Sequence, residues 1–161
     1  MTSTINAPEL WAARLPKPSN DGHKYHRGHA VILGAESYTG ATRLAAEACS
    51  RIGAGLVTVH SRSPAHVYRA TLPADIMVRD DELSALNRPS TILAGPGGCN
   101  DAQAAALSDL SDPFDLVLDA DAIRFCQTQT AQSCIITPHE GEFDRYFGGR
   151  SVDAEARASD A

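Results

Sequence analysis

Short apolar runs without polar alternation, separated by segments of helical periodicity, constrain the fold of this chain more than any other feature. Strands that bury both faces read as continuous apolar runs, whereas strands with one face in water alternate. The pattern therefore predicts an α/β fold with a mainly parallel sheet covered by helices on both faces. The expected buried strands are 29–33, 56–60, 75–78, 91–94, 115–118 and 133–137, and the expected helices are 39–52, 64–68, 102–110 and 141–147.

Charge and hydropathy argue against two classes of partner. The 161 residues hold 14 Lys+Arg and 20 Asp+Glu, a net charge of −6, with no basic cluster for nucleic acid or an anionic membrane. No apolar stretch reaches the roughly 18 residues of a membrane span, and the first residues lack the pattern of a signal peptide. The 4 cysteines form no Cys-x-x-Cys pair, which argues against a zinc knuckle. We expect one cytoplasmic domain over residues 1–161.

Two glycine-containing loops follow predicted strands, at the edge where open parallel sheets bind ligands. The loop 34–40 leads into a helix whose free N–H groups favour a phosphate or a carbonyl, but it has neither a P-loop nor a dinucleotide fingerprint. By itself it reads better as an ordinary turn. The loop 95–99 begins Gly-Pro-Gly-Gly, which allows close backbone approach or simply a tight turn before a helix cap.

Two further loops, 119–121 and 138–142, carry carboxylates and one histidine. Asp119 and Asp121 end a predicted strand, where they could bind a metal-phosphate or orient a base; the alternative is that one of them caps the following turn. His139 and Glu142 follow Pro138 at a predicted helix start, and the imidazole can donate or accept a hydrogen bond there. The other histidines read as structural or solvated, except that the basic stretch 23–27 around His26 could reach a phosphate or simply be exposed.

The order of these motifs resembles one family. The segments Thr39-Gly-Ala-Thr-Arg-Leu-Ala-Ala, Gly53-Ala-Gly-Leu-Val-Thr-Val, Asp119-Ala-Asp-Ala and Thr137-Pro-His-Glu-Gly-Glu resemble, over residues 22–147, the ADP/ATP-dependent NAD(P)H-hydrate dehydratases of the carbohydrate-kinase-domain family. The resemblance implies a ribokinase-like three-layer sandwich. It also implies cofactor repair, in which water is removed from the (S)-hydrate of NADH or NADPH at the expense of ADP or ATP with Mg²⁺.

The resemblance assigns roles to six residues. It implies that Ala41, Gly97 and His139 line the hydrate pocket, where small residues let the nicotinamide approach and the imidazole forms a hydrogen bond. Glu142 would assist the Mg²⁺-bound phosphate, and Asp119 or Asp121 would organise the floor of the pocket. No residue of this chain is expected to bind the metal directly.

The family continues with a Lys-Gly segment and a Gly-Thr-Gly-Asp loop that holds the transferring phosphate and supplies the catalytic base. Neither motif occurs in these residues, so we expect an incomplete domain without the family's C-terminal part. Activity of this chain alone is in doubt. Its partners would be NAD(P)H hydrate, an adenine nucleotide, and a second copy in a homo-oligomer or a complementing C-terminal half.

Two alternatives stay open at this point. The first is a non-catalytic module that binds the ligand or depends on a partner. The second is a ribokinase-fold kinase of a small molecule, against which His139 replaces the asparagine that such kinases carry.

Overall fold

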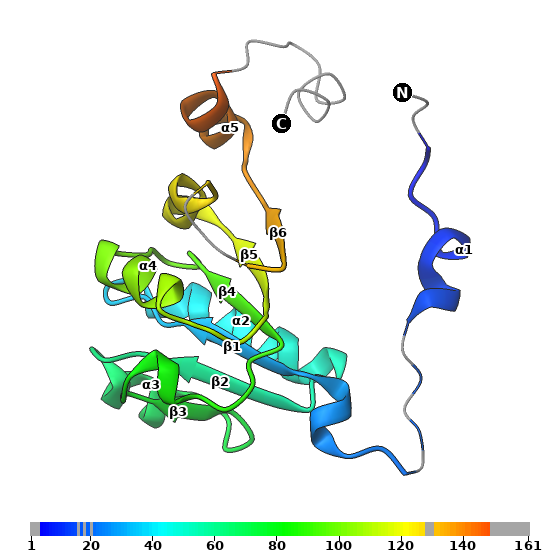
Figure 1. Ribbon diagram of the computed structural model, residues 1–161, viewed down its shortest axis with the longest axis horizontal. Helices are drawn as coiled ribbons and strands as arrows, with labels where there is room; N and C mark the ends of the chain where they lie inside the picture. The colour runs from blue at the N-terminus through cyan, green and yellow to red at the C-terminus, as the bar shows by residue number, and fades with distance from the viewer. Residues whose placement is uncertain (1–3, 16, 18, 20, 128–130, 149–161) are drawn as a thin grey trace.

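A parallel sheet of six strands forms the centre of the computed structural model, which describes residues 4–15, 17, 19, 21–127 and 131–148 (Figure 1). The strand order is β3-β2-β1-β4-β5-β6, and every neighbouring pair is parallel. The predicted parallel sheet is therefore confirmed. Its strands are β1 (His29–Leu33), β2 (Leu56–His60), β3 (Met77–Arg79), β4 (Thr91–Ala94), β5 (Asp115–Leu118) and β6 (Ser133–Ile136).

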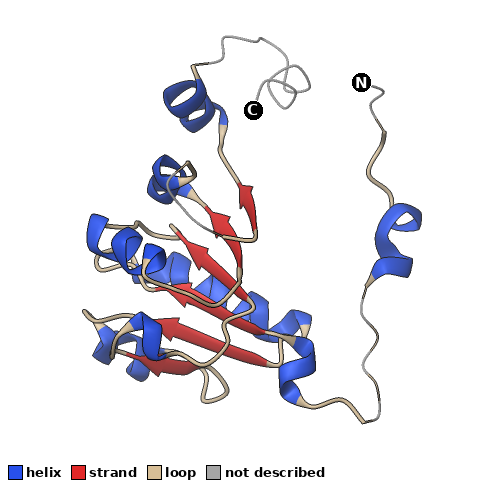
Figure 2. Cartoon of the chain, in the orientation of Figure 1, coloured by secondary structure: helices blue, strands red, loops and turns tan. Residues whose placement is uncertain are grey.

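Helices lie on both faces of the sheet and make it the middle of three layers (Figure 2). Helices α2 (Thr39–Ile52) and α3 (Ala65–Thr71) cover one face. Helix α4 (Asp101–Ser108) and the 3₁₀ helices η3 (Leu83–Ala85) and η4 (Ala120–Phe125) cover the other. The remaining elements are α1 (Pro8–Trp11), η1 (Ala12–Arg14), η2 (Lys24–Arg27) and α5 (Glu140–Phe147). None of the described helices is long and apolar enough to cross a membrane.

Each face of the sheet builds its own core, because successive strand side chains point to opposite faces. On the α4 side, Val31, Ile92 and Leu116 pack beneath Leu107 of α4. On the α2 side, Ile32, Val57 and Val59 pack against Ala46 of α2 and Tyr68 of α3. Continuous apolar strands thus divide their side chains between two cores, as the sequence predicts.

One part of the sheet is less covered than predicted. Ile32, Leu93, Val117 and Ile135 form a row across β1, β4, β5 and β6 on the α2 side. Ile32 is buried, Leu93 and Val117 are partly exposed, and Ile135 is 60% exposed. The prediction of a fully buried strand at 133–137 is therefore wrong, because β6 is the edge strand and α2 lies over β1 and β2.

Helix α2 forms over the predicted residues, and most of its apolar stripe is exposed. Its buried residues are Thr42 and Ala46, whereas Leu44 and Ile52 are 72% and 85% exposed. Ser50, on the flank opposite this exposed stripe, donates a hydrogen bond to Asp75 next to β3. The exposed apolar stripe of Ala41, Leu44, Ala48 and Ile52 consequently faces away from β3.

We expect the same Ile→Ala substitution to lower the free energy of unfolding by different amounts at a buried and at an exposed position of the sheet. Ile92→Ala removes a fully buried side chain and should lower the free energy of unfolding by about 2–5 kcal/mol. Ile135→Ala removes a side chain that is 60% exposed and should lower it by less than about 1 kcal/mol. Urea denaturation measures both, and equal losses would show that the β6 face is covered.

Candidate functional site

The predicted loops follow β1, β4, β5 and β6, so parallel pairing places all of them at one edge of the sheet (Figure 1). These strands are consecutive neighbours, so the loops stand in the same order along the edge. At about 4.8 Å per strand, the first loop and the last are roughly 14 Å apart. The structure thus gathers the predicted residues on one side of the molecule, in a row long enough for an extended ligand.

The first two loops touch through their backbones. Gly97 has a φ of +88°, and a Cβ there would collide with the carbonyl oxygen of Tyr38, just before α2. It would also lie 3.0 Å from Cβ of Ala35. Only glycine fits both the positive φ and this approach. Ala41 stands in the first turn of α2 with an exposed side chain, so it is close in sequence to the point where the loops meet.

A buried threonine also connects these two loops. Thr42 Oγ1 accepts the amide of Ala35 at 3.1 Å and donates to the carbonyl of Pro96 at 2.8 Å. The Tyr68 hydroxyl donates to the carbonyl of Ala35 at 2.7 Å and lies 3.2 Å from Thr42 Oγ1. Burial raises the pKa of Tyr68, which keeps the phenol protonated as a donor. Sequence reasoning missed Thr42, because its partners are distant in the chain.

The second and third loops meet at Gly95. This glycine has a φ of +115°, and a Cβ there would collide with the carbonyl oxygen of Asp119. The amide of Asp119 donates to the carbonyl of Ala94 at 2.9 Å. The third loop is therefore packed directly against the glycine turn of the second.

Asp119 also joins the third loop to the fourth, since its carboxylate accepts the hydroxyl of Thr137 at 2.8 Å. The alternative that it caps the following turn is wrong, because it stands at the N-cap of η4 without a side-chain capping bond. Ala120, at a φ of +49°, separates it from the exposed Asp121. The strand ends at Leu118, so the alternation that would align the two carboxylates does not continue.

His139 is held at the start of α5 by a reciprocal capping arrangement with Glu142. Its Nδ1 accepts the amides of Gly141 and Glu142 at 3.1 and 3.3 Å, and its own amide donates to Glu142 Oε2 at 2.9 Å. Because Nδ1 accepts, the neutral ring carries its proton on Nε2, which lies 3.3 Å from Glu142 Oε1. The His139 side chain is 73% exposed. Its capping role and its access to a ligand are therefore compatible.

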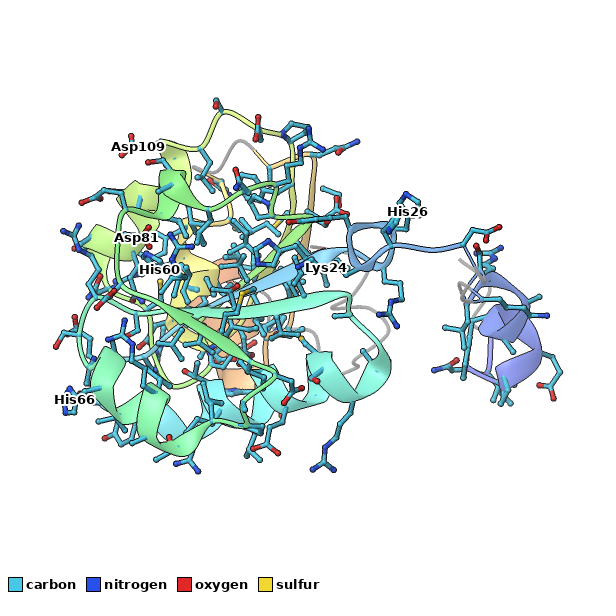
Figure 3. All side chains as sticks on the ribbon, turned by 90° about the horizontal axis from the view of Figure 1, so that it is seen from below. Lys24, His26, His60, His66, Asp81 and Asp109 are labelled. Atoms are coloured by element: carbon cyan, nitrogen blue, oxygen red, sulfur yellow. The ribbon has the colours of Figure 1, made fainter. Side chains whose placement is uncertain are left out.

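A cavity of about 110 Å³ lies at the same edge, beside the first two loops. Glu36 and Asn100 from these loops line it and are joined by a hydrogen bond of 3.1 Å. His60 and Arg62 line it from the end of β2, and His60 Nε2 contacts the carbonyl of Asp81 at 2.7 Å (Figure 3). The predicted residues do not line this cavity. Sequence reasoning missed its polar lining because the loop after β2 was not considered, although His60 ends a predicted strand and Arg62 lies two residues beyond it.

Other features do not compete with this edge. An open hollow of about 510 Å³ lies at the opposite end of the sheet, beside Ser90 and Asp115. Burial raises the pKa of the Cys99 thiol to about 11, so it is unsuited to be a nucleophile at neutral pH. In the described part of the chain, no group of three or more His, Cys, Asp or Glu side chains could hold a metal ion.

Comparison with known proteins identifies related sequences. Residues 29–159 match the carbohydrate-kinase family described as NAD(P)H-hydrate dehydratase. The bifunctional NAD(P)H-hydrate repair enzyme of Coxiella burnetii is 37% identical, over 83% of this chain and 30% of its own length. The ADP-dependent (S)-NAD(P)H-hydrate dehydratase of Listeria monocytogenes is 31% identical, over 86% of this chain and 55% of its own.

Solved structures share the fold. The ADP/ATP-dependent NAD(P)H-hydrate dehydratase of Bacillus subtilis, co-crystallised with ATP and Mg²⁺, superimposes with a TM-score of 0.73 at 27% identity, covering 88% of this chain and 55% of that one. A ribokinase-like superfamily protein of Enterococcus faecalis gives 0.71 at 26% identity, covering 88% and 56%. The chain therefore has a ribokinase-like fold and spans only about a third to just over a half of these relatives. It belongs to the NAD(P)H-hydrate dehydratase family.

Proposed function

We propose that this chain binds the (S)-hydrate of NADH or NADPH and contributes to its dehydration at the expense of ADP or ATP. One observation carries the proposal: loops after four neighbouring strands touch one another in order at a single edge, with glycine backbone packed between them. A nicotinamide ring needs such a close backbone approach, and family membership supplies the reaction.

The proposed binding residues act through small size and donor groups. Ala41 stands in the first turn of α2, where free backbone N–H groups and a short side chain suit a polar ring substituent. Gly97 lets the two loops approach without a side chain between them, and the exposed His139 ring would share its Nε2–H between Glu142 Oε1, at 3.3 Å, and the substrate. These three residues would hold the hydrate, and none of them supplies the chemistry of phosphate transfer.

Mg²⁺ fits this edge as a companion of the nucleotide. Asp119, Asp121 and Glu142 carry the oxygen atoms that Mg²⁺ prefers, yet they form no three-ligand cluster in the described residues. They would therefore act on the metal through water, while the nucleotide phosphates bind it directly. When bound, Mg²⁺ neutralises negative charge on the phosphates during transfer.

Turnover requires a further part of the protein. We infer that this part corresponds to the portion of the relatives that this chain does not match. Neither the phosphate-binding loop nor the base of the family occurs in the sequence. The row of Leu93, Val117 and Ile135 is partly exposed on the α2 side of the sheet, which gives an apolar helix a surface to cover. We propose that residues 1–161 are one incomplete domain, completed by a complementing C-terminal part; a second copy on this face is the other outcome to test.

Joining this chain to a complementing part tests the proposed reaction. We expect no conversion of NADH hydrate by the chain alone with ADP and Mg²⁺. A chimera that adds the C-terminal part of the Listeria monocytogenes relative after Phe147 should restore absorbance at the reduced-nicotinamide band. A chimera that unfolds in one cooperative transition and still gives no conversion would contradict the dehydratase function.

Gly97 gives a second test with a matched control. Both Gly97→Ala and Gly98→Ala place a side chain at positive φ, but only the first collides with Tyr38, since a Cβ on Gly98 meets open space. We expect Gly97→Ala to weaken binding of NADPH hydrate by roughly tenfold or more and Gly98→Ala by less than about threefold. Isothermal titration calorimetry measures both, and equal affinities would remove Gly97 from the pocket.

The two roles of His139 can be separated. His139→Ala should lower both the stability of the chain and its affinity for NADPH hydrate, because cap and donor are lost together. His139→Ser keeps a capping oxygen and should recover most of the roughly 1 kcal/mol of the cap, without recovering affinity. Thermal unfolding and calorimetry report the two effects, and normal affinity in His139→Ser would show that the ring is purely structural.

A further inference from the structure

Thr42 and its hydrogen-bond partner Pro96 are each adjacent in sequence to a proposed binding residue of the hydrate pocket. It directly follows Ala41, and its partner Pro96 directly precedes Gly97. The hydrogen bond between Thr42 Oγ1 and the Pro96 carbonyl, 2.8 Å long, spans 54 positions of the chain. One side chain thus connects the immediate neighbours of two proposed contact residues.

The direction of these hydrogen bonds is fixed by chemistry. The Ala35 N–H can only donate and the Pro96 carbonyl can only accept, so the Thr42 hydroxyl must accept from the first and donate to the second. Thr42 is fully buried, so losing its hydroxyl would leave two backbone groups without a partner away from water. Both loops would then have to move to satisfy them.

Two hydrogen bonds nearer the surface also connect these loops to neighbouring groups, but water can compete for them. Gln103 Nε2 donates to the carbonyl of Gly34 at 2.9 Å, and Asn100 Nδ2 donates to Glu36 at 3.1 Å. These bonds are partly buried or exposed, where water competes for the same groups. Thr42 therefore provides the buried connection, on the inner side of α2.

We propose that Thr42 is a positioning residue of the hydrate pocket: it holds the backbone at Ala41 and Gly97 at the separation that the nicotinamide ring requires. Tyr68 supports this position by fixing the carbonyl of Ala35 and packing its hydroxyl beside Thr42. The inference rests on the proposed function and adds a residue that does not touch the substrate.

The test compares three variants of the full 161-residue chain. Thr42→Val keeps the shape and removes the hydroxyl, whereas Thr42→Ser keeps the hydroxyl. Thr58→Val is the matched control, since Thr58 is 1% exposed and its hydroxyl contacts His29 Nε2 at 2.8 Å, away from the loops. Calorimetry with NADPH hydrate gives the affinity, and amide hydrogen exchange reports the Ala35 N–H and the loop 95–98.

We expect Thr42→Val to weaken binding roughly tenfold and to accelerate exchange at Ala35, with Thr42→Ser within about twofold of the wild type. Thr58→Val should lose comparable stability without loss of affinity. Unchanged exchange at Ala35, or wild-type affinity in Thr42→Val, would overturn this inference and leave the proposed function standing. No binding of the hydrate by the wild-type chain would overturn the proposed function, and the role of Thr42 in it.

Discussion

Parallel hydrogen bonding between strands determines where chemistry can occur in this molecule. Because the strands are parallel, all of them begin at one end of the sheet and finish at the other. The loop that follows each strand therefore lies at the end where the strands finish. Four loops from β1, β4, β5 and β6 become neighbours although more than a hundred positions separate the first from the last. Glycines at 95 and 97 then let adjacent loops pack backbone against backbone. The position of the site is therefore set first by the parallel pairing of the strands and only then by individual side chains.

Much of the fold could be predicted because apolar runs and helical spacing are local signals. Strands 29–33, 56–60, 91–94 and 115–118 have the predicted bounds, since glycine or serine flanks the first three and polar Asp115 and Asp119 mark the limits of the fourth. Burial was harder to predict. The run around Ile135 has the composition of a core strand, yet β6 lies at the edge of the sheet, and strand position is a property of the whole topology. The exposure of the apolar stripe of α2 could not be predicted for the same reason, because the helical spacing of apolar residues does not say which surface they cover.

The candidate site divides in a similar way. The family motifs pointed to Ala41, Gly97 and His139, and their common edge follows from parallel strands. What the sequence could not provide is the set of long-range hydrogen bonds. Thr42 reads as a polar interruption in an alanine-rich helix, and only its distances to Ala35 and Pro96 reveal what it does. The cap formed by His139 was likewise not predicted, although its residue spacing is compatible with one.

The partly exposed apolar row of Leu93, Val117 and Ile135 couples the folding of the chain to any association that covers this row. A molecule that covers this row binds the native chain and not the unfolded one, so it draws the equilibrium toward the native state by mass action. If the proposed complementing part covers this row, the melting temperature of the chain varies with the concentration of that part. A stability measured on the isolated chain is then a lower bound for the proposed assembly.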